Sequence, residues 1–167
     1  MLLAWFLAWP VEAYIRVHRR KLLPRGVPIA AEDQLWLRAY FSLALLDCVR
    51  VVEEDPLPIA GPPFAGAMRK LGFEFPEVRQ VAAITFDCVV ATREPMSRAT
   101  MFHELVHVAQ YRALGIRGFA REYVWGLLQS RAYEEIPLEV AAYGLEERFA
   151  AGSAEAFSVE AECRIGA

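Results

Sequence analysis

The chain is poor in the features that would place it quickly in several large classes of protein. Its 167 residues carry a net charge of −3 and a pI near 5.7, so the excess of positive charge that marks a nucleic-acid interface is missing. Three cysteines, odd in number and without a CxxC pair, give no sign of a disulfide framework and indicate reduced thiols. Histidine is equally scarce, and two of the three histidines fall within one five-residue motif.

The sequence also lacks an apolar run long enough to span a membrane. Residues 1–15 are largely apolar, but Pro10 and Glu12 interrupt a run that is already shorter than the about 20 residues a spanning helix needs. The basic cluster at 16–21 follows the apolar run, whereas a secretory signal places its positive charge first. We therefore expect a cytoplasmic protein. Its N-terminal helix packs on the core, lies on an anionic membrane surface, or anchors the chain.

The most informative feature present is the pentad HELVH at residues 103–107, which has the pattern HExxH. At about 3.6 residues per turn, positions i and i+4 lie on one helix face, so His103 and His107 can converge on one ion about 2.0 to 2.1 Å away. Glu104 is rotated by about 100° from His103 and does not compete as a ligand. It is placed to act as general base on a water molecule that the metal activates. The pattern is typical of zinc hydrolases, and two ordinary core histidines are the alternative.

A catalytic zinc ion usually has three protein ligands, so the sequence must supply one more. Gln110 and Ala113 stand where a metzincin would have glycine and histidine, which excludes that class. His18 lies far upstream in the basic cluster, where a surface position is expected. No aspartate occurs after Asp87, so a downstream acidic ligand must be a glutamate. The first candidates are Glu122, Glu134, Glu135, Glu139, Glu146 and Glu147.

Glu139 fits best among these glutamates. Pro137 predicts the first turn of a helix, and the apolar stripe of that helix runs directly beside Glu139. A glutamate next to a buried stripe is either a ligand or a buried group that needs a partner. The pair at 134–135 is expected at a helix start, where the helix dipole favours carboxylates, and the pair at 146–147 on a solvated face.

Two segments carry a resemblance to a known family. HELVHVAQYRALG at 103–115 and YEEIPLEVAAY at 133–143 resemble the active-site half of the gluzincins, and more closely small bacterial proteins with HELVHVxQYRxLG and YxxIPLExxAY blocks. The resemblance implies a zinc metallopeptidase in which a glutamate of the second helix, here Glu139, is the third zinc ligand. In those families a small residue, here Ala142, often follows three positions later. The best-known gluzincins place the glutamate nearer to the second histidine, at a distance that would fall on 126–127 here.

The rest of the pattern predicts an α+β fold, a minimal zincin-like domain that is mainly helical with a small antiparallel sheet packed near the HExxH helix. Residues 31–47 have apolar side chains at helical spacing, and the β-branched residues at 48–53 predict a strand. Ser97 is placed to cap the HExxH helix, and Gly115 to end it. A further helix is predicted at 119–131.

Residues 78–91 predict a bent strand or a hairpin that turns at Asp87. Zincins hold an extended substrate along an edge strand near the active-site helix, so by resemblance this segment is the candidate substrate edge. An ordinary core strand is the alternative. Tyr143 and Tyr133 are candidate donors of a hydrogen bond to the developing oxyanion, although buried tyrosines more often satisfy structural partners.

We divide the chain into an N-terminal helix at 1–22, a zincin-like domain at 23–151 and a flexible tail at 152–167. One domain of this size buries a core but lacks a second lobe to wall a deep cleft. The leading hypothesis is a zinc-dependent hydrolase, a metallopeptidase acting on a peptide or protein. The alternative is a non-catalytic binding or membrane-associated module that zinc stabilises, and Glu104 argues against it. Hydrolysis of a non-peptide amide stays open, as does completion of the cleft by a partner or an oligomer.

Overall fold

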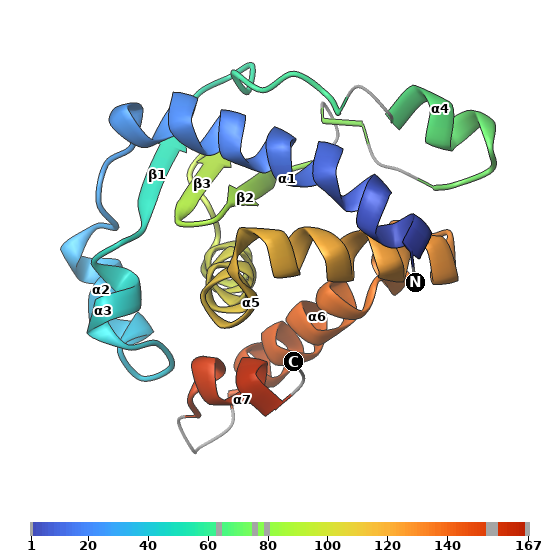
Figure 1. Ribbon diagram of the computed structural model, residues 1–167. Coiled ribbons are helices and arrows are strands. Elements are labelled where there is room, and N and C mark those ends of the chain that lie inside the picture. Colours follow the sequence, from blue (N-terminus) through green and yellow to red (C-terminus); the bar gives the residue numbers. More distant parts are fainter. Residues whose placement is uncertain (1, 63–64, 75–76, 79–80, 153–156, 166–167) are drawn as a thin grey trace.

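The chain folds as a small α+β unit. The computed structural model describes residues 2–62, 65–74, 77–78, 81–152 and 157–165 (Figure 1). Helices account for most of these residues, and three short strands form one sheet. The predicted α+β class is confirmed.

The sheet is mixed, whereas the sequence predicted an antiparallel one. Strand β2 (Ala83–Phe86) pairs with β3 (Val89–Thr92) in antiparallel fashion, and the predicted hairpin turns at Asp87, whose φ is 60°. Strand β1 (Arg50–Glu53) joins the other side of β3 in parallel. The difference arises because a long connection, which includes α4 (Ala65–Lys70), separates β1 from the hairpin and allows the chain to re-enter in the same direction.

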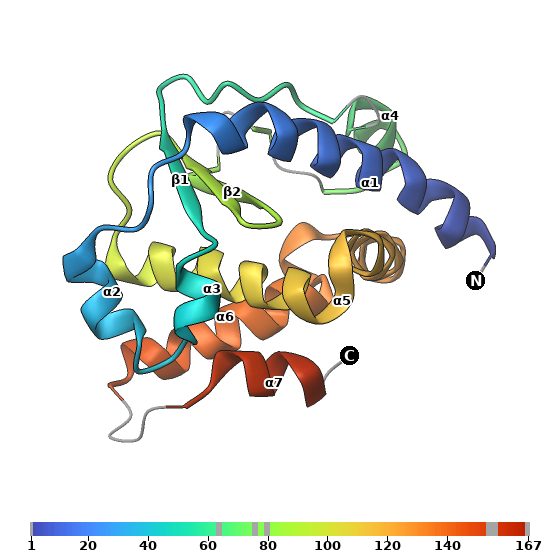
Figure 2. The same cartoon turned by 60° about the vertical axis from the view of Figure 1, so that its left-hand side comes forward.

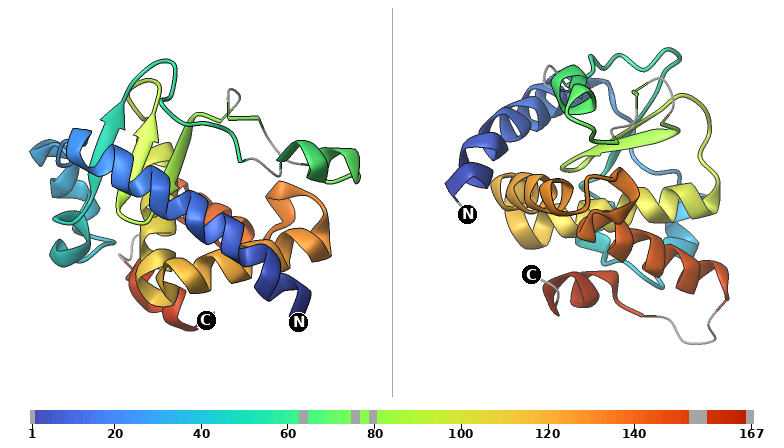
Figure 3. Two further views of the ribbon diagram at one scale, coloured as in Figure 1. Left: turned by 45° about the horizontal axis from the view of Figure 1, so that its top comes forward. Right: turned by 90° about the vertical axis from the view of Figure 1, so that its right-hand side faces the viewer.

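Helix α1 (Leu2–Leu22), followed by the short turn η1 (Leu23–Arg25), is part of the core. It crosses the strands, as Figure 3 shows on its left side. Val11 and Ile15 are buried against the hairpin and against the helix that follows it, while Trp9 is 71% exposed. Among the helices of the described residues, none is long and apolar enough to cross a membrane.

Helix α5 (Arg98–Ser130) carries the HExxH pentad and has two parts. The Ser97 hydroxyl accepts a hydrogen bond from the Thr100 N–H at 3.1 Å, which confirms the predicted cap. Gly115 has φ 68° and ψ 164°, so the helix breaks there, and its direction changes between residues 98–114 and residues 116–130. We call these the first and second halves of α5. After α5 come the turn η2 (Tyr133–Glu135) and helix α6 (Pro137–Ala150).

The segment predicted as one helix at 31–47 forms two. Helix α2 (Ala31–Leu37) ends, and helix α3 (Leu43–Leu46) begins after a turn. The reason lies in Ser42, whose hydroxyl accepts from the Leu45 N–H at 3.3 Å and caps a new helix. The apolar spacing continues across the turn because both helices face the same core.

Two hydrophobic cores lie on the two faces of β3. Successive strand residues point to opposite faces, so Val90 lies in the first core and Val89 and Ala91 lie in the second. The first core joins the first half of α5 to α2, α3 and α6. The second core joins the second half of α5 to α1 and the hairpin. Figure 2 shows the sheet between α1 and α5.

The C-terminal segment at 152–167, predicted as a flexible tail, differs from that prediction where it is described. Helix α7 (Val159–Ile165) lies in it, and Phe157 and Val159 are buried in the first core. The predicted tail was based on small and acidic residues, but Phe157 and Val159 pack in the first core, and the Val159 N–H donates to the Tyr40 carbonyl at 3.1 Å. Residues 153–156 and 166–167 lie outside the described part of the chain.

Candidate metal centre

His103 and His107 from α5 and Glu139 from α6 come together as a buried cluster. The two Nε2 atoms are 3.1 Å apart, and Glu139 Oε2 lies 3.6 Å from His103 Nε2 and 3.4 Å from His107 Nε2. Three ligand atoms of a tetrahedral zinc ion, each about 2.0 to 2.1 Å from the metal, lie about 3.3 Å from one another. The spacing of the three atoms therefore fits such an ion.

Glu139 has the environment of a ligand. In the described part of the chain its Oε2 is the one buried side-chain oxygen or nitrogen without a hydrogen-bond partner. Burial acts to raise the pKa of Glu139, but the charge of His107 and polar contacts with His103 and Tyr133 outweigh it and hold that pKa well below its usual range. An ionised oxygen aimed between two imidazoles is costly to bury unless a cation satisfies it.

His107 is affected in the opposite direction. Burial acts to lower its pKa, but the neighbouring carboxylates of Glu139 and Glu104 and a hydrogen bond to Gln110 raise it to about 9. In the metal-free protein the proton on His107 is thus the counter-charge of Glu139. A divalent cation would displace this proton, because only neutral imidazole binds a metal.

The outer nitrogens of both rings have fixed partners. His107 Nδ1 donates to Gln110 Oε1 at 2.9 Å, and Gln110 Nε2 donates to the Leu138 carbonyl at 2.8 Å. His103 Nδ1 lies 3.0 Å from Glu146 Oε2. Such contacts set the tautomer and direct both Nε2 atoms inward. Gln110 also ties α5 to the first turn of α6, where Glu139 lies.

The prediction that Glu146 lies on a solvated face was wrong. Its side chain is 26% exposed and contacts His103. Glu139 and Glu146 are seven residues apart, which is two helical turns, so they share the face of α6 that meets α5. That spacing was visible in the sequence, as was the spacing of three residues between His107 and Gln110.

The other glutamates that were considered lie away from the cluster. Glu134 and Glu135 are exposed in η2, and Glu147 is exposed on α6. Glu122 accepts hydrogen bonds from the guanidinium of Arg121 at 3.1 and 2.9 Å.

His18 is also remote from the cluster, but it is buried rather than at the surface. Its ring stacks on Phe86 with centroids 5.1 Å apart, and its Nδ1 lies 2.9 Å from the Tyr14 carbonyl. Burial lowers the pKa of His18. His18 is therefore a neutral side chain that packs in the core.

Glu104 lies beside the cluster and faces the hairpin. Thr85 Oγ1 of β2 donates to Glu104 Oε2 at 2.6 Å. Burial raises the pKa of Glu104, although the charge of His107 and the Thr85 hydrogen bond partly oppose the rise. A carboxylate with a raised pKa suits a group that takes and returns a proton near neutral pH. Thr85 was missed from the sequence, because nothing local marks a threonine whose partner lies on another element.

The two candidate tyrosines have different places. Tyr133 lies beside Glu139, and burial raises its pKa, so its hydroxyl remains a neutral donor. The Tyr143 ring lies against His103 with centroids 4.7 Å apart, and this side chain is 40% exposed. Tyr133 lines one cavity together with Glu104 and Glu139, whereas Tyr143 packs on His103 outside the lining of that cavity.

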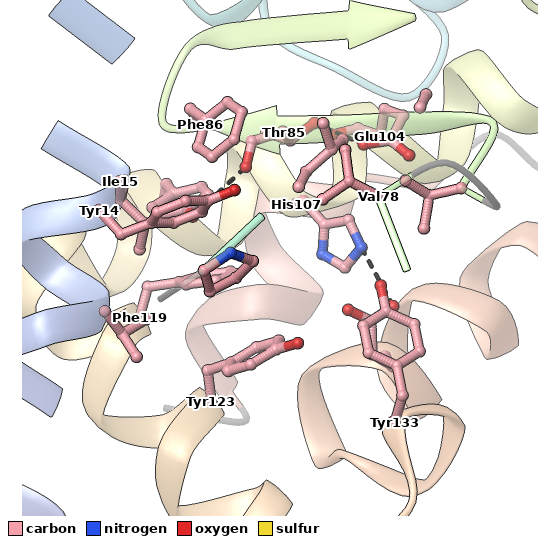
Figure 4. Close-up of a pocket in the computed structure, with 17 residues that line it drawn as sticks. Tyr14, Ile15, Val78, Thr85, Phe86, Glu104, His107, Phe119, Tyr123 and Tyr133 are labelled. Carbon is pink, nitrogen blue, oxygen red and sulfur yellow. Dashed lines mark hydrogen bonds and ion pairs between the residues drawn. The ribbon is translucent and has the colours of Figure 1, made fainter. Parts of the chain in front are cut away.

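A cavity of about 120 Å³ opens on the Glu104 side of the cluster. Glu104, His107 and Glu139 contribute to one part of its wall. Figure 4 shows His107 between Tyr14 and Phe119 on one side and Tyr133 on the other. The aromatic side chains that line the cavity are Tyr14, Phe86, Tyr111, Phe119, Tyr123 and Tyr133.

No protein-family model, curated protein or solved structure matches this chain. Function must therefore be argued from the geometry of the site itself.

Proposed function

We propose that the chain is a zinc-dependent hydrolase, a metallopeptidase that cleaves a peptide bond with Glu104 as general base. The observation that carries the proposal is the buried Glu139 Oε2, which has no hydrogen-bond partner and faces two imidazoles at metal-ligand spacing. His103, His107 and Glu139 would hold the ion. Glu104 stands beside them without being a ligand.

The bound zinc would supply Lewis-acid chemistry, polarising the scissile carbonyl and lowering the pKa of water. Side chains of the protein transfer the protons and stabilise the developing charge. Glu104 accepts a proton from the attacking water and returns it to the leaving amine, and Thr85 fixes the carboxylate in that position. The Tyr133 hydroxyl, which contacts Glu139, is a candidate donor to the developing oxyanion.

The number of ligands favours a catalytic over a purely structural role. Structural zinc sites usually close with four protein ligands, whereas catalytic sites have three and leave a position for water. Among the described residues, the cluster of metal-ligating groups has three members. A base beside the cluster and a cavity next to it also agree with catalysis, since a structural ion needs neither.

The test combines metal content with cleavage. We expect one zinc ion per chain by elemental analysis, and cleavage of members of a broad peptide library. Glu104→Gln should keep the zinc but lower the turnover of a cleaved peptide by about 10² to 10⁴, the range for loss of a general base. The matched control is Glu135→Gln, the same change at an exposed glutamate nearby.

Two results would count against the proposal. If the purified protein takes up no transition metal at neutral pH, the proposed metal centre is ruled out. Stoichiometric zinc that raises the melting temperature, with no cleavage of any library member, would instead indicate a non-catalytic zinc-stabilised module.

A further inference from the structure

The cavity beside Glu104 combines the polar groups of the proposed metal centre with a wall of apolar side chains. Its surface is largely apolar, formed by aromatic rings together with aliphatic side chains of α1 and β2. Two of its tyrosine hydroxyls are already engaged with backbone, since Tyr14 donates to the Ala60 carbonyl at 2.8 Å and Tyr111 to the Thr85 carbonyl at 3.4 Å. These hydroxyls do not need a polar group from a ligand.

The N-terminal helix supplies one wall. Val11, Tyr14 and Ile15 of α1 line the cavity, and Val11 and Ile15 are 8% and 4% exposed. The contact between Tyr14 and Ala60 fixes this face of α1 to the segment that follows β1. Helix α1 therefore limits the space beside Glu104, a role that its sequence did not suggest.

The size and charge of the cavity restrict what can enter it. An apolar protein cavity of about 150 Å³ accepts benzene. At about 120 Å³, this cavity suits a group between isobutyl and phenyl in size. The apolar part of the lining offers little to replace the hydration of a charged group, so a carboxylate would be costly to bury there.

We propose that this cavity selects the substrate of the hydrolase by taking one compact, uncharged, apolar side chain next to the scissile bond. This inference rests on the proposed function, because only a hydrolase would have a substrate here. The selectivity of the cavity for apolar groups depends on its walls alone. Substrates with leucine-sized or phenylalanine-sized side chains fit it. Those with acidic or much larger side chains do not.

The first experiment needs no metal. Benzene, isobutanol and benzoate are titrated into the metal-free protein, and binding is followed by thermal melts and by chemical shifts of the aromatic residues. We expect saturable binding of the two neutral probes and none of benzoate. Val11→Phe fills the cavity and should weaken benzene binding by about tenfold or more. Val17→Phe is the matched control, the same change at a 62% exposed position of α1.

The second experiment uses the zinc-loaded protein and two hydroxamates, acetohydroxamate and isovalerohydroxamate. Each buried methylene contributes about a fourfold gain in affinity, so the longer chain should bind more than tenfold tighter. This gain should shrink in Val11→Phe and persist in Val17→Phe.

The outcomes separate the two proposals. Zinc uptake with equal affinity for both hydroxamates, or no binding of the neutral probes to a folded protein, overturns the selective cavity and leaves the metal centre standing. Binding of benzene that Val11→Phe abolishes, in a protein that takes up no zinc, supports the cavity and overturns the hydrolase.

Discussion

The two halves of α5, which meet at Gly115, serve the site in different ways. In the first half every residue from Phe102 to Tyr111 is buried, so the helix is covered on all sides. In the second half the buried residues are spaced along the helix, and positions such as Trp125 are exposed. A helix covered on all sides can send His103 towards α6 and Glu104 towards the sheet. A helix buried on one face can line a cavity and pack against a neighbouring helix.

The two halves contribute different parts of the candidate site. The first half holds three groups of the candidate centre within five residues. The second half contributes Phe119 and Tyr123 to the cavity, and through Gly126 it contacts Pro137 at the start of α6. Glu139 follows two residues later, so the second half positions the proposed third ligand without supplying one.

Removal of a proposed ligand tests whether the first half of α5 alone supplies the metal-binding groups of this helix. His107→Ala should remove stoichiometric zinc, because one of three ligands is lost. Tyr123→Phe, a change in the second half that retains the ring, should keep the zinc. Zinc titration against a chelator with known affinity measures both. Retention of tight zinc binding by a folded His107→Ala protein would place the metal elsewhere.

The next effect concerns the support of a ligand. Gln110→Ala removes the acceptor of His107 Nδ1 and the link to the Leu138 carbonyl, so zinc affinity should fall by about 10- to 100-fold. Gln129→Ala, at an exposed position in the second half, is the control and should have no effect. The same chelator titration applies. An unchanged affinity in Gln110→Ala would mean that the ring of His107 is held by packing alone.

A third change tests whether the second half of α5 supports the position of Glu139. A Cβ at Gly126 would lie 2.5 Å from Pro137 Cδ and 3.0 Å from Ile136 Cγ2, so Gly126→Ala must shift the start of α6. We expect a loss of about 1 to 3 kcal/mol in the free energy of unfolding, measured in urea. We also expect weaker zinc binding, because Glu139 moves with α6.

The control for this change is Gly144→Ala in α6, where an added Cβ meets nothing within 4 Å. An exposed helical glycine replaced by alanine should stabilise the protein by about 0.5 to 1 kcal/mol. If Gly126→Ala lowers stability but leaves zinc affinity intact, the second half of α5 supports the fold and not the centre.

Local geometry explains what the sequence could predict. The two histidines and Glu104 follow from the period of one helix, the Ser97 cap from the first turn of that helix, and the hairpin at Asp87 from neighbouring strands. Each depends on residues close together in the chain. Glu139 was preferred among six glutamates because Pro137 predicts a helix start and an apolar stripe runs beside Glu139.

Non-local docking explains what was missed. The contacts of Thr85 with Glu104 and of Glu146 with His103 depend on how β2 and α6 are placed against α5. The parallel pairing of β1, and the burial of Val159 in a segment with the composition of a tail, depend on the same placement. The pattern of residues within one element does not show how that element packs against another. Residue spacing can therefore predict such contacts only after the neighbouring element is known.

The smallest expected effect probes the start of the first half. Ser97→Ala leaves the Thr100 N–H without its acceptor, and the free energy of unfolding should fall by about 1 kcal/mol, because water replaces part of the bond at this exposed position. Ser97→Asp should restore it, since a carboxylate caps the helix and interacts favourably with its dipole. Thermal melts of the two variants measure this difference. Zinc affinity should remain unchanged in both variants, because His103 lies more than one turn inside a helix that is buried on all sides. A loss of zinc affinity in Ser97→Ala would show that fraying at the start of the first half reaches His103.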